Sequence, residues 1–223
     1  MGIDGTQKGS ACYLGSCFLI FFGVTVAVTL VRSFDVPLAS FLVPVLWGTA
    51  ALLPGWRSQT SPPALGLTGF QFKKGLRLFI LSSITVFPLY ILLFHFSLQL
   101  GFDVPSDLIP HGVTVFQWIV YNFAVVALVE ELFFRGYLQG CLEDYADRVF
   151  PGGGAAFWFP IVTTAFLFAL AHAAADMDLY RMSVIFPGLL FGWLRARTGA
   201  ILAPVLSHGA ANLMSMLLIK SVS

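Results

Sequence analysis

Charge is scarce in this sequence. Only 10% of its 223 residues are charged, against about 25% in soluble domains. The formal net charge is +1, so the chain has no basic excess of the kind that binds nucleic acid, and we exclude nucleic acid as a partner. The sequence also has no internal repeat, so the inverted-repeat architecture of many secondary transporters has no support in it.

Cysteine is scarce as well. The chain has three cysteines, Cys12, Cys17 and Cys141. Their number is odd, and two of them lie in or beside the first apolar run, so they do not form a disulfide framework. We interpret them as small apolar side chains.

Hydrophobic residues are abundant. They make up 58% of the chain, including 23 Phe. Several apolar runs reach the roughly 20 residues that cross a hydrocarbon core of about 30 Å. Because the runs are long and uniformly apolar, they exclude the alternating pattern of a membrane β-barrel. We expect a single multi-pass membrane domain over residues 1–223, an all-α transmembrane bundle of six to eight helices in a lipid bilayer. The runs are 12–31, 37–55, 78–98, 113–138, 156–174, 183–197 and 200–219.

Basic residues are distributed unequally between alternate ends of these runs, eight on one side and three on the other. The positive-inside rule then predicts a cytoplasmic amino terminus, and we expect the membrane to be a bacterial or archaeal cell membrane. The larger set is Lys8, Arg57, Lys73, Lys74, Arg77, Arg148, Arg195 and Arg197, and the smaller set is Arg32, Arg181 and Lys220.

Glycine and proline mark three local features. Pro44 and Pro54 interrupt the second run, and residues 57–77 form the longest polar connection, which we interpret as a linker. Gly188 and Gly192 have the small-xxx-small spacing that lets a neighbouring helix approach closely.

The segment VEELFFRGYLQG, residues 129–140, places charge inside an apolar run. A charged side chain at the bilayer centre costs about 3 kcal/mol, so such residues face the bundle interior and mark function. On a helix, Glu131 and Arg135 are i,i+4 and share a face, whereas Glu130 points elsewhere. We expect Arg135 to neutralise Glu131 and not Glu130. The alternative is that all three form a helix end that snorkels to water.

Three more polar residues lie in other apolar runs. His172 ends one run, four residues after Phe168, while His208 and Asn212 share a face of the last run as an i,i+4 pair. Buried polar side chains in lipid must find one another. We therefore expect Glu130, His172, His208 and Asn212 to converge. We interpret the other two histidines, His95 and His111, as a packing or interfacial residue and a loop residue.

A carboxylate with two imidazoles and an amide can hydrolyse an acyl bond. A glutamate in an apolar pocket takes a proton from water as that water attacks a carbonyl. A histidine positions the water or protonates the leaving group, and an amide and a second imidazole stabilise the oxyanion. Glu130, His172 and His208 could also bind zinc, but the sequence has no H-E-x-x-H helix. We favour a site without a cofactor.

Three motifs in this region resemble those of the CPBP family of intramembrane proteases, named for CAAX prenyl endopeptidases and bacteriocin processing and also called the Abi family. The family's E-E-x-x-x-R runs from Glu130 to Arg135, its F-x-x-x-H from Phe168 to His172, and its H-x-x-x-N/D from His208 to Asn212. The resemblance covers residues 113–219, which we take as the catalytic core.

The resemblance implies a glutamate-dependent intramembrane endopeptidase in a helical bundle. In this interpretation Glu130 is the base, His172 its partner at the water, His208 and Asn212 stabilise the oxyanion, and Glu131 and Arg135 maintain the geometry. The substrate would be a protein or peptide in or at the membrane. CAAX-type processing, bacteriocin or peptide maturation and removal of a carboxyl-terminal sorting anchor all remain open.

Two other functions are compatible with the sequence. One is a catalytically silent scaffold or chaperone with the same fold, since fold does not imply function. The other is a proton-coupled carrier that uses a Glu and His relay. The span boundaries also place His172 and His208 at different depths in the membrane.

Overall fold

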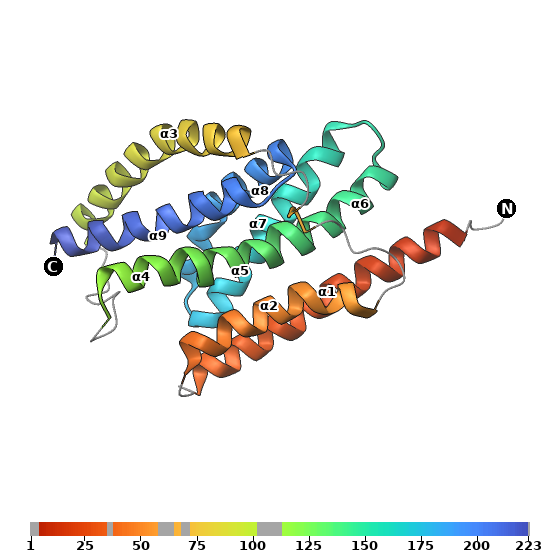
Figure 1. The fold of residues 1–223 in the computed structure, drawn as a ribbon, viewed down its shortest axis with the longest axis horizontal. Coiled ribbons are helices and arrows are strands. Elements are labelled where there is room, and N and C mark those ends of the chain that lie inside the picture. Colours follow the sequence, from red (N-terminus) through yellow and green to blue (C-terminus); the bar gives the residue numbers. More distant parts are fainter. Residues whose placement is uncertain (1–4, 35–37, 58–64, 68–71, 102–112, 223) are drawn as a thin grey trace.

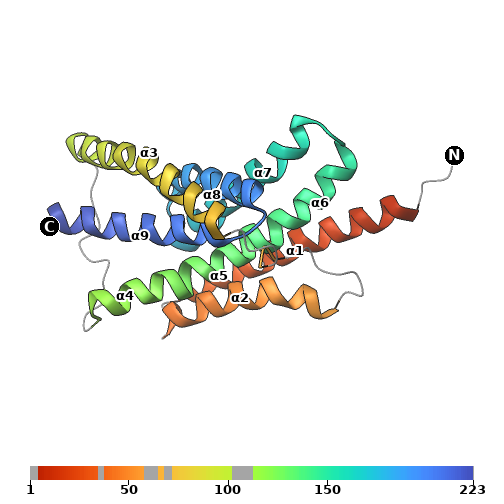
Figure 2. The ribbon, with the colours of Figure 1, turned by 45° about the horizontal axis from the view of Figure 1, so that its top comes forward.

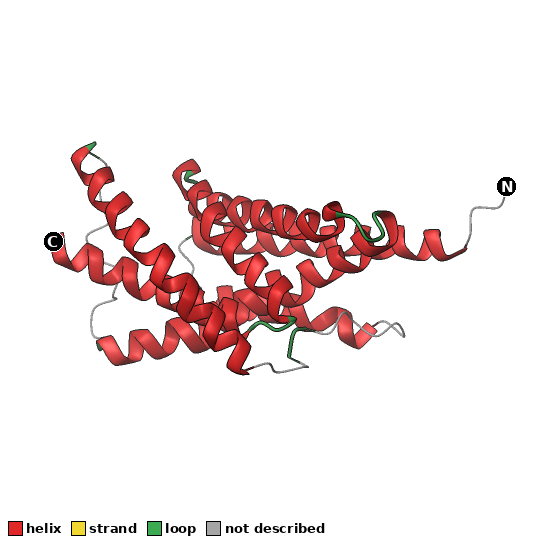
Figure 3. Ribbon diagram, turned by 90° about the horizontal axis from the view of Figure 1, so that it is seen from above, coloured by secondary structure: helices red, strands yellow, loops and turns green. Residues whose placement is uncertain are grey.

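The apolar runs form helices, because a backbone in lipid must satisfy its own hydrogen bonds. The computed structural model describes residues 5–34, 38–57, 65–67, 72–101 and 113–222. Within these ranges the chain forms helices and no strand (Figure 3), which confirms the all-α prediction. The helices are α1 Gly5–Ser33, α2 Ala39–Arg57, α3 Phe72–Gln99, α4 Val115–Tyr121, η1 Asn122–Ala127, α5 Leu128–Glu131, η2 Leu132–Leu138, α6 Gln139–Val149, α7 Gly154–Asp176, η3 Leu179–Val184, α8 Ile185–Thr198 and α9 Leu202–Val222.

Five helical segments in the described ranges are long and apolar enough to cross a membrane, which confirms a polytopic membrane protein. α2 is shorter in its apolar part, Ala39–Leu52. It is nevertheless one helix that continues through Pro44 and Pro54, so the expected interruption there is wrong. The five segments are Leu14–Ser33, Phe72–Gln99, Val115–Val149, Gly154–Asp176 and Leu202–Val222.

Two predicted boundaries differ from the structure. The fourth apolar run ends at residue 138, but the helix continues to Val149. Its last part, α6, is amphipathic, so the apolar pattern does not extend over it. α3 begins at Phe72, so the basic residues assigned to the end of the 57–77 linker lie in a helix. Residues 58–64 and 68–71 of that linker lie outside the described part, as do His111 and the side chain of Cys12.

The continuous rod from α4 to α6 lies in the middle of the bundle (Figures 1 and 2). α1 and α2 pack together on one side of it, and α9 and then α3 lie on the other side. α7 contacts α1, α6 and α8, so it joins the two sides. The midpoint of this rod, α5, contacts α2 on one side and α9 on the other.

Successive membrane helices run in alternating directions (Figure 1), as the sequence-based count of basic residues assumed. At one end, the last turn of α1 is joined to the end of α7 by an ion pair between Arg32 and Asp176. At the other end, the connection after α2 meets the start of α9 through a hydrogen bond from Ile201 N to Gly66 O of 3.2 Å. Which end faces the cytoplasm stays a prediction.

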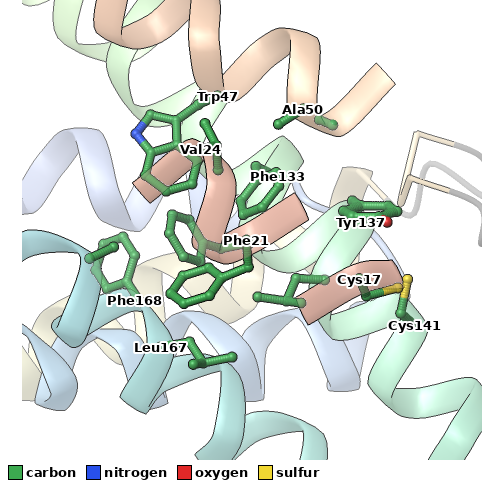
Figure 4. Packing of buried hydrophobic residues seen from close by; sticks show 14 of the residues in the cluster. Cys17, Phe21, Val24, Trp47, Ala50, Phe133, Tyr137, Cys141, Leu167 and Phe168 are labelled. Atoms are coloured by element: carbon green, nitrogen blue, oxygen red, sulfur yellow. The ribbon is translucent and has the colours of Figure 1, made fainter. Parts of the chain in front are cut away.

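An aromatic cluster fixes the rod against its neighbours (Figure 4). Trp47 of α2 packs on Phe133 of η2 with ring centroids 4.8 Å apart, and Phe134 packs edge-on against Phe168 of α7 at 5.0 Å. Each such pair contributes about 0.5–1.5 kcal/mol beyond its buried area. Cys17 and Cys141 are buried in the same cluster, which agrees with their interpretation as small apolar side chains.

Candidate active site

The two adjacent glutamates lie in a short α-helical turn, α5, between two π-helical segments, η1 and η2. A π-helical turn widens a helix and often occurs at a functional site. Glu131 is fully buried, while 14% of the Glu130 side chain is exposed. The two carboxylates therefore have different environments, as the helical geometry predicted.

Glu131 is the centre of a buried polar network. Its Oε1 accepts a hydrogen bond from Arg135 Nη1 at 3.1 Å and another from His208 Nδ1 at 2.8 Å. The first contact confirms the predicted i,i+4 pair. Arg135 is fully buried, so the alternative that these charges snorkel to water is wrong. Because the helix continues to Val149, Arg135 is not at a helix end.

The same network reaches α8 through the carbonyls of two glycines. Arg135 Nη2 donates to Gly188 O at 3.1 Å, and Gln139 Nε2 donates to Gly192 O at 3.0 Å. A Cβ atom at Gly188 would lie 3.3 Å from the Cβ of Ala165 on α7. The small-xxx-small spacing thus permits the predicted close approach and also exposes two carbonyls as acceptors.

Two phenylalanines cover the network. The Arg135 guanidinium lies 4.4 Å from the ring centroid of Phe168 and 5.3 Å from that of Phe191. The rings of Phe168 and His172 are 4.3 Å apart, and His208 stacks on Phe191 at 5.3 Å with an interplanar angle of 16°. A desolvated cation–π contact contributes about 2 kcal/mol. These rings therefore stabilise Arg135 and restrict both imidazoles.

Hydrogen bonds also define how each imidazole is oriented. His172 Nδ1 lies 2.9 Å from the carbonyl oxygen of Phe168, and His208 Nδ1 contacts the Glu131 carboxylate. Both partners are acceptors, so each Nδ1 carries a proton and each Nε2 is directed elsewhere. The two Nε2 atoms lie 3.7 Å (His172) and 3.9 Å (His208) from the same atom, Glu130 Oε2.

When both imidazoles are neutral, His172 Nε2, His208 Nε2 and Glu130 Oε2 are therefore three hydrogen-bond acceptors that lie close together. The distances are too long for direct hydrogen bonds, and Glu130 Oε2 accepts none from a described protein group. A small recess of about 30 Å³ adjoins Glu130 and His172. This volume holds a water molecule, and a water can donate two hydrogen bonds to such acceptors. The geometry suits a water held between a base and two imidazoles.

Asn212 lies one turn after His208 on α9, but no hydrogen bond or ion pair in the described part of the chain joins it to Glu130, His172 or His208. Its Nδ2 donates instead to Asn122 Oδ1 at 3.2 Å. The Asn122 Nδ2 in turn donates to the Trp118 carbonyl at 3.0 Å, which defines which end of that amide accepts. Asn122 therefore orients the Asn212 amide.

A larger cavity of about 590 Å³ opens beside this centre. Glu130 forms part of its wall, and the other lining residues come from α1, α2, α4, η1 and α7. The described residues contain no group of three His, Cys, Asp or Glu side chains arranged to hold a metal ion. The lining residues are Arg32, Ala39, Ser40, Val43, Pro44, Tyr121, Val126, Glu130, Ala175 and Asp176.

The structure brings Glu130, His172 and His208 together, although the two histidines lie at different distances from the starts of their helices. His172 lies 18 residues after the start of α7, whereas His208 lies six residues after the start of α9. The hairpin between α6 and α7 extends well beyond the start of α9 (Figure 1), and this offset compensates for the difference. His95, which was not assigned to the site, is exposed on α3.

Sequence analysis missed Asn122, Phe191 and the cavity residues of α1 and α2. The sequence could have indicated Asn122 as a site residue, because a single amide in an apolar run is costly in lipid. Phe191 and the cavity residues carried none, since their roles depend on which helices become neighbours.

Fold and site together define an integral membrane protein with a polar site between its helices. Residues 112–214 match the family described as Type II CAAX prenyl endopeptidase Rce1-like. The match confirms the resemblance to the CPBP family for this part of the chain and supports intramembrane protease activity in general. Neither curated proteins nor solved structures give a match to the chain.

Proposed function

We propose that this protein is an intramembrane endopeptidase that hydrolyses a peptide bond in a membrane-associated protein or peptide, with water activated by Glu130 as the nucleophile. One observation carries the proposal. Two imidazole Nε2 atoms, of His172 and His208, lie 3.7 and 3.9 Å from one oxygen of Glu130, beside a cavity of about 590 Å³. No cofactor is required for this chemistry.

In the proposed reaction Glu130 takes a proton from the water held near His172, and the water oxygen bonds to the peptide carbonyl carbon. The carbonyl oxygen becomes an oxyanion. When the C–N bond breaks, the proton passes from Glu130 to the leaving amine. His172, whose Nε2 lies beside Glu130 Oε2, orients the groups for this transfer. One water is consumed, and the products are a carboxylic acid and an amine, which exchange a proton to become a carboxylate and an ammonium group.

His208 and Asn212 are the proposed donors to the oxyanion. Because His208 Nδ1 already donates to Glu131, its Nε2 can donate only when the imidazole is protonated. The Glu131 carboxylate stabilises that imidazolium. Asn212 uses one amide proton for Asn122 and keeps the other for the substrate. Glu131 and Asn122 are positioning residues in this proposal.

The test compares the terminal peptides of all membrane and exported proteins between cells that carry the native protein and cells that carry Glu130→Gln at equal abundance. We expect a set of termini to disappear in the variant. Glu143→Gln is the matched control, since Glu143 lies on the same rod but contacts Gln139 and Arg195 instead of the cavity. Unchanged termini in Glu130→Gln cells would favour a silent scaffold instead.

A further inference from the structure

Arg32 places a positive charge at the wall of the candidate active site. It belongs to the last turn of α1, in the half of the chain outside the family match. It lines both the 590 Å³ cavity and the small recess that adjoins Glu130 and His172. In the described part of the chain, Arg32 is the one arginine or lysine that lines the cavity.

Asp176 does not fully neutralise the positive charge around it. Arg32 Nη1 pairs with Asp176 Oδ1, and Arg181 Nε pairs with Asp176 Oδ2 at 2.9 Å. Two guanidinium groups therefore share one carboxylate, and the cluster has one positive charge in excess. Arg32 uses a single nitrogen in this contact, and its side chain is 47% exposed. Its other donors contact no acceptor among the described residues.

We propose that Arg32 forms a carboxylate-binding subsite for the substrate. A guanidinium presents a planar pair of donors that matches the two oxygens of a carboxylate. A cavity of this volume is about 10 Å across, and an extended chain advances about 3.4 Å per residue. The bound carboxylate therefore lies within a few residues of the scissile bond. This proposal rests on the proposed endopeptidase function.

Asp176 is the resting partner of Arg32 in this subsite. An incoming carboxylate binds the remaining guanidinium donors or displaces Asp176, and Arg181 retains Asp176 after displacement. A purely structural role for the cluster makes a different prediction. Removal of Arg32 or Asp176 would then break the ion pair between α1 and α7, and removal of Arg181 would release one oxygen of Asp176, so all three variants would loosen the same cluster.

The experiment uses the purified full chain in lipid nanodiscs and a randomised nonapeptide library without acidic residues. The library is made with free carboxyl termini, with amidated termini, and with amidated termini plus one glutamate near the end. New termini are quantified by mass spectrometry. The two charged forms distinguish a terminal carboxylate from an acidic side chain as the ligand. The variants are Arg32→Gln, Arg181→Gln and Asp176→Asn.

We expect the native protein to cleave at least one charged form about tenfold faster than the uncharged form, as for one hydrogen bond to a charged group. Arg32→Gln reduces this ratio to about one. Arg181→Gln preserves the ratio, and Asp176→Asn preserves or raises it because the variant removes the carboxylate that competes for Arg32. The proposal is overturned if the native ratio is already one, if Arg32→Gln keeps the ratio, or if all three variants lose it together. If no cleavage of any form depends on Glu130, the proposed function itself fails.

Discussion

The adjacent glutamates allow one sharp test, because the same Glu→Gln change at positions 130 and 131 should have opposite consequences. Glu131 Oε1 accepts hydrogen bonds from Arg135 and His208, and the Glu131 and Arg135 side chains are fully buried. Glutamine keeps one acceptor oxygen but removes the negative charge. Arg135 then remains charged and buried without a counter-ion.

Removal of one partner from a buried ion pair costs about 3–5 kcal/mol. Since the Gly188 carbonyl and the Phe168 ring still stabilise Arg135, we expect Glu131→Gln to lower the free energy of unfolding by about 3 kcal/mol, the lower end of that range. Glu130 Oε2 has no hydrogen-bond partner among described protein groups. Glu130→Gln should therefore change stability by less than about 1 kcal/mol, because no pairing is lost.

The assay is SDS-induced unfolding of the purified chain in mixed micelles, followed by tryptophan fluorescence. Trp47 is buried against Phe133 and Phe134 and reports on the packing of the rod. The reasoning is refuted if Glu131→Gln is as stable as the native protein, or if Glu130→Gln is the more destabilised of the two.

Three further predictions follow from the site and its packing. Asn122→Ala should lower kcat about tenfold with little change in KM, as expected when one oriented donor to the transition state is lost; a rise in KM alone would contradict a positioning role. Gly209→Ala should destabilise the protein by about 1–3 kcal/mol because its Cβ would lie 2.5 Å from the Phe123 ring, while Gly23→Ala, whose Cβ meets nothing within 4 Å, should not destabilise it in the same unfolding assay. Extensive dialysis against a chelator should leave peptide cleavage unchanged, and recovery of lost activity by added zinc would show that the site needs a metal.

The helices were predictable because the membrane imposes one rule along the whole chain. Any run of about 20 apolar residues must be helical to satisfy its backbone, so the helices lie close to the apolar runs. The errors arose where a helix contains charged residues or proline, because the apolar pattern then does not show how far the helix extends. α6 carries Glu143 and other charges yet stays helical, and α2 continues through Pro44 and Pro54.

The site was predictable only as far as local geometry extends. The pairing of Glu131 with Arg135 depends on four residues of helix and was correctly expected. The pairing of Glu131 with His208 spans 77 residues and depends on how α9 packs against the rod. The cavity could not be predicted for the same reason, since Arg32 in its wall forms an ion pair with a residue 144 positions away.

The most direct test of the central claim is cleavage of the nonapeptide library by the purified full chain in nanodiscs, with Glu130→Gln compared with Glu143→Gln at equal amounts of folded protein. The account predicts that Glu143→Gln cleaves like the native protein and that Glu130→Gln loses cleavage by at least about 100-fold, as expected for removal of a general base. Cleavage by Glu130→Gln at the native rate would contradict the assignment of Glu130 as the base.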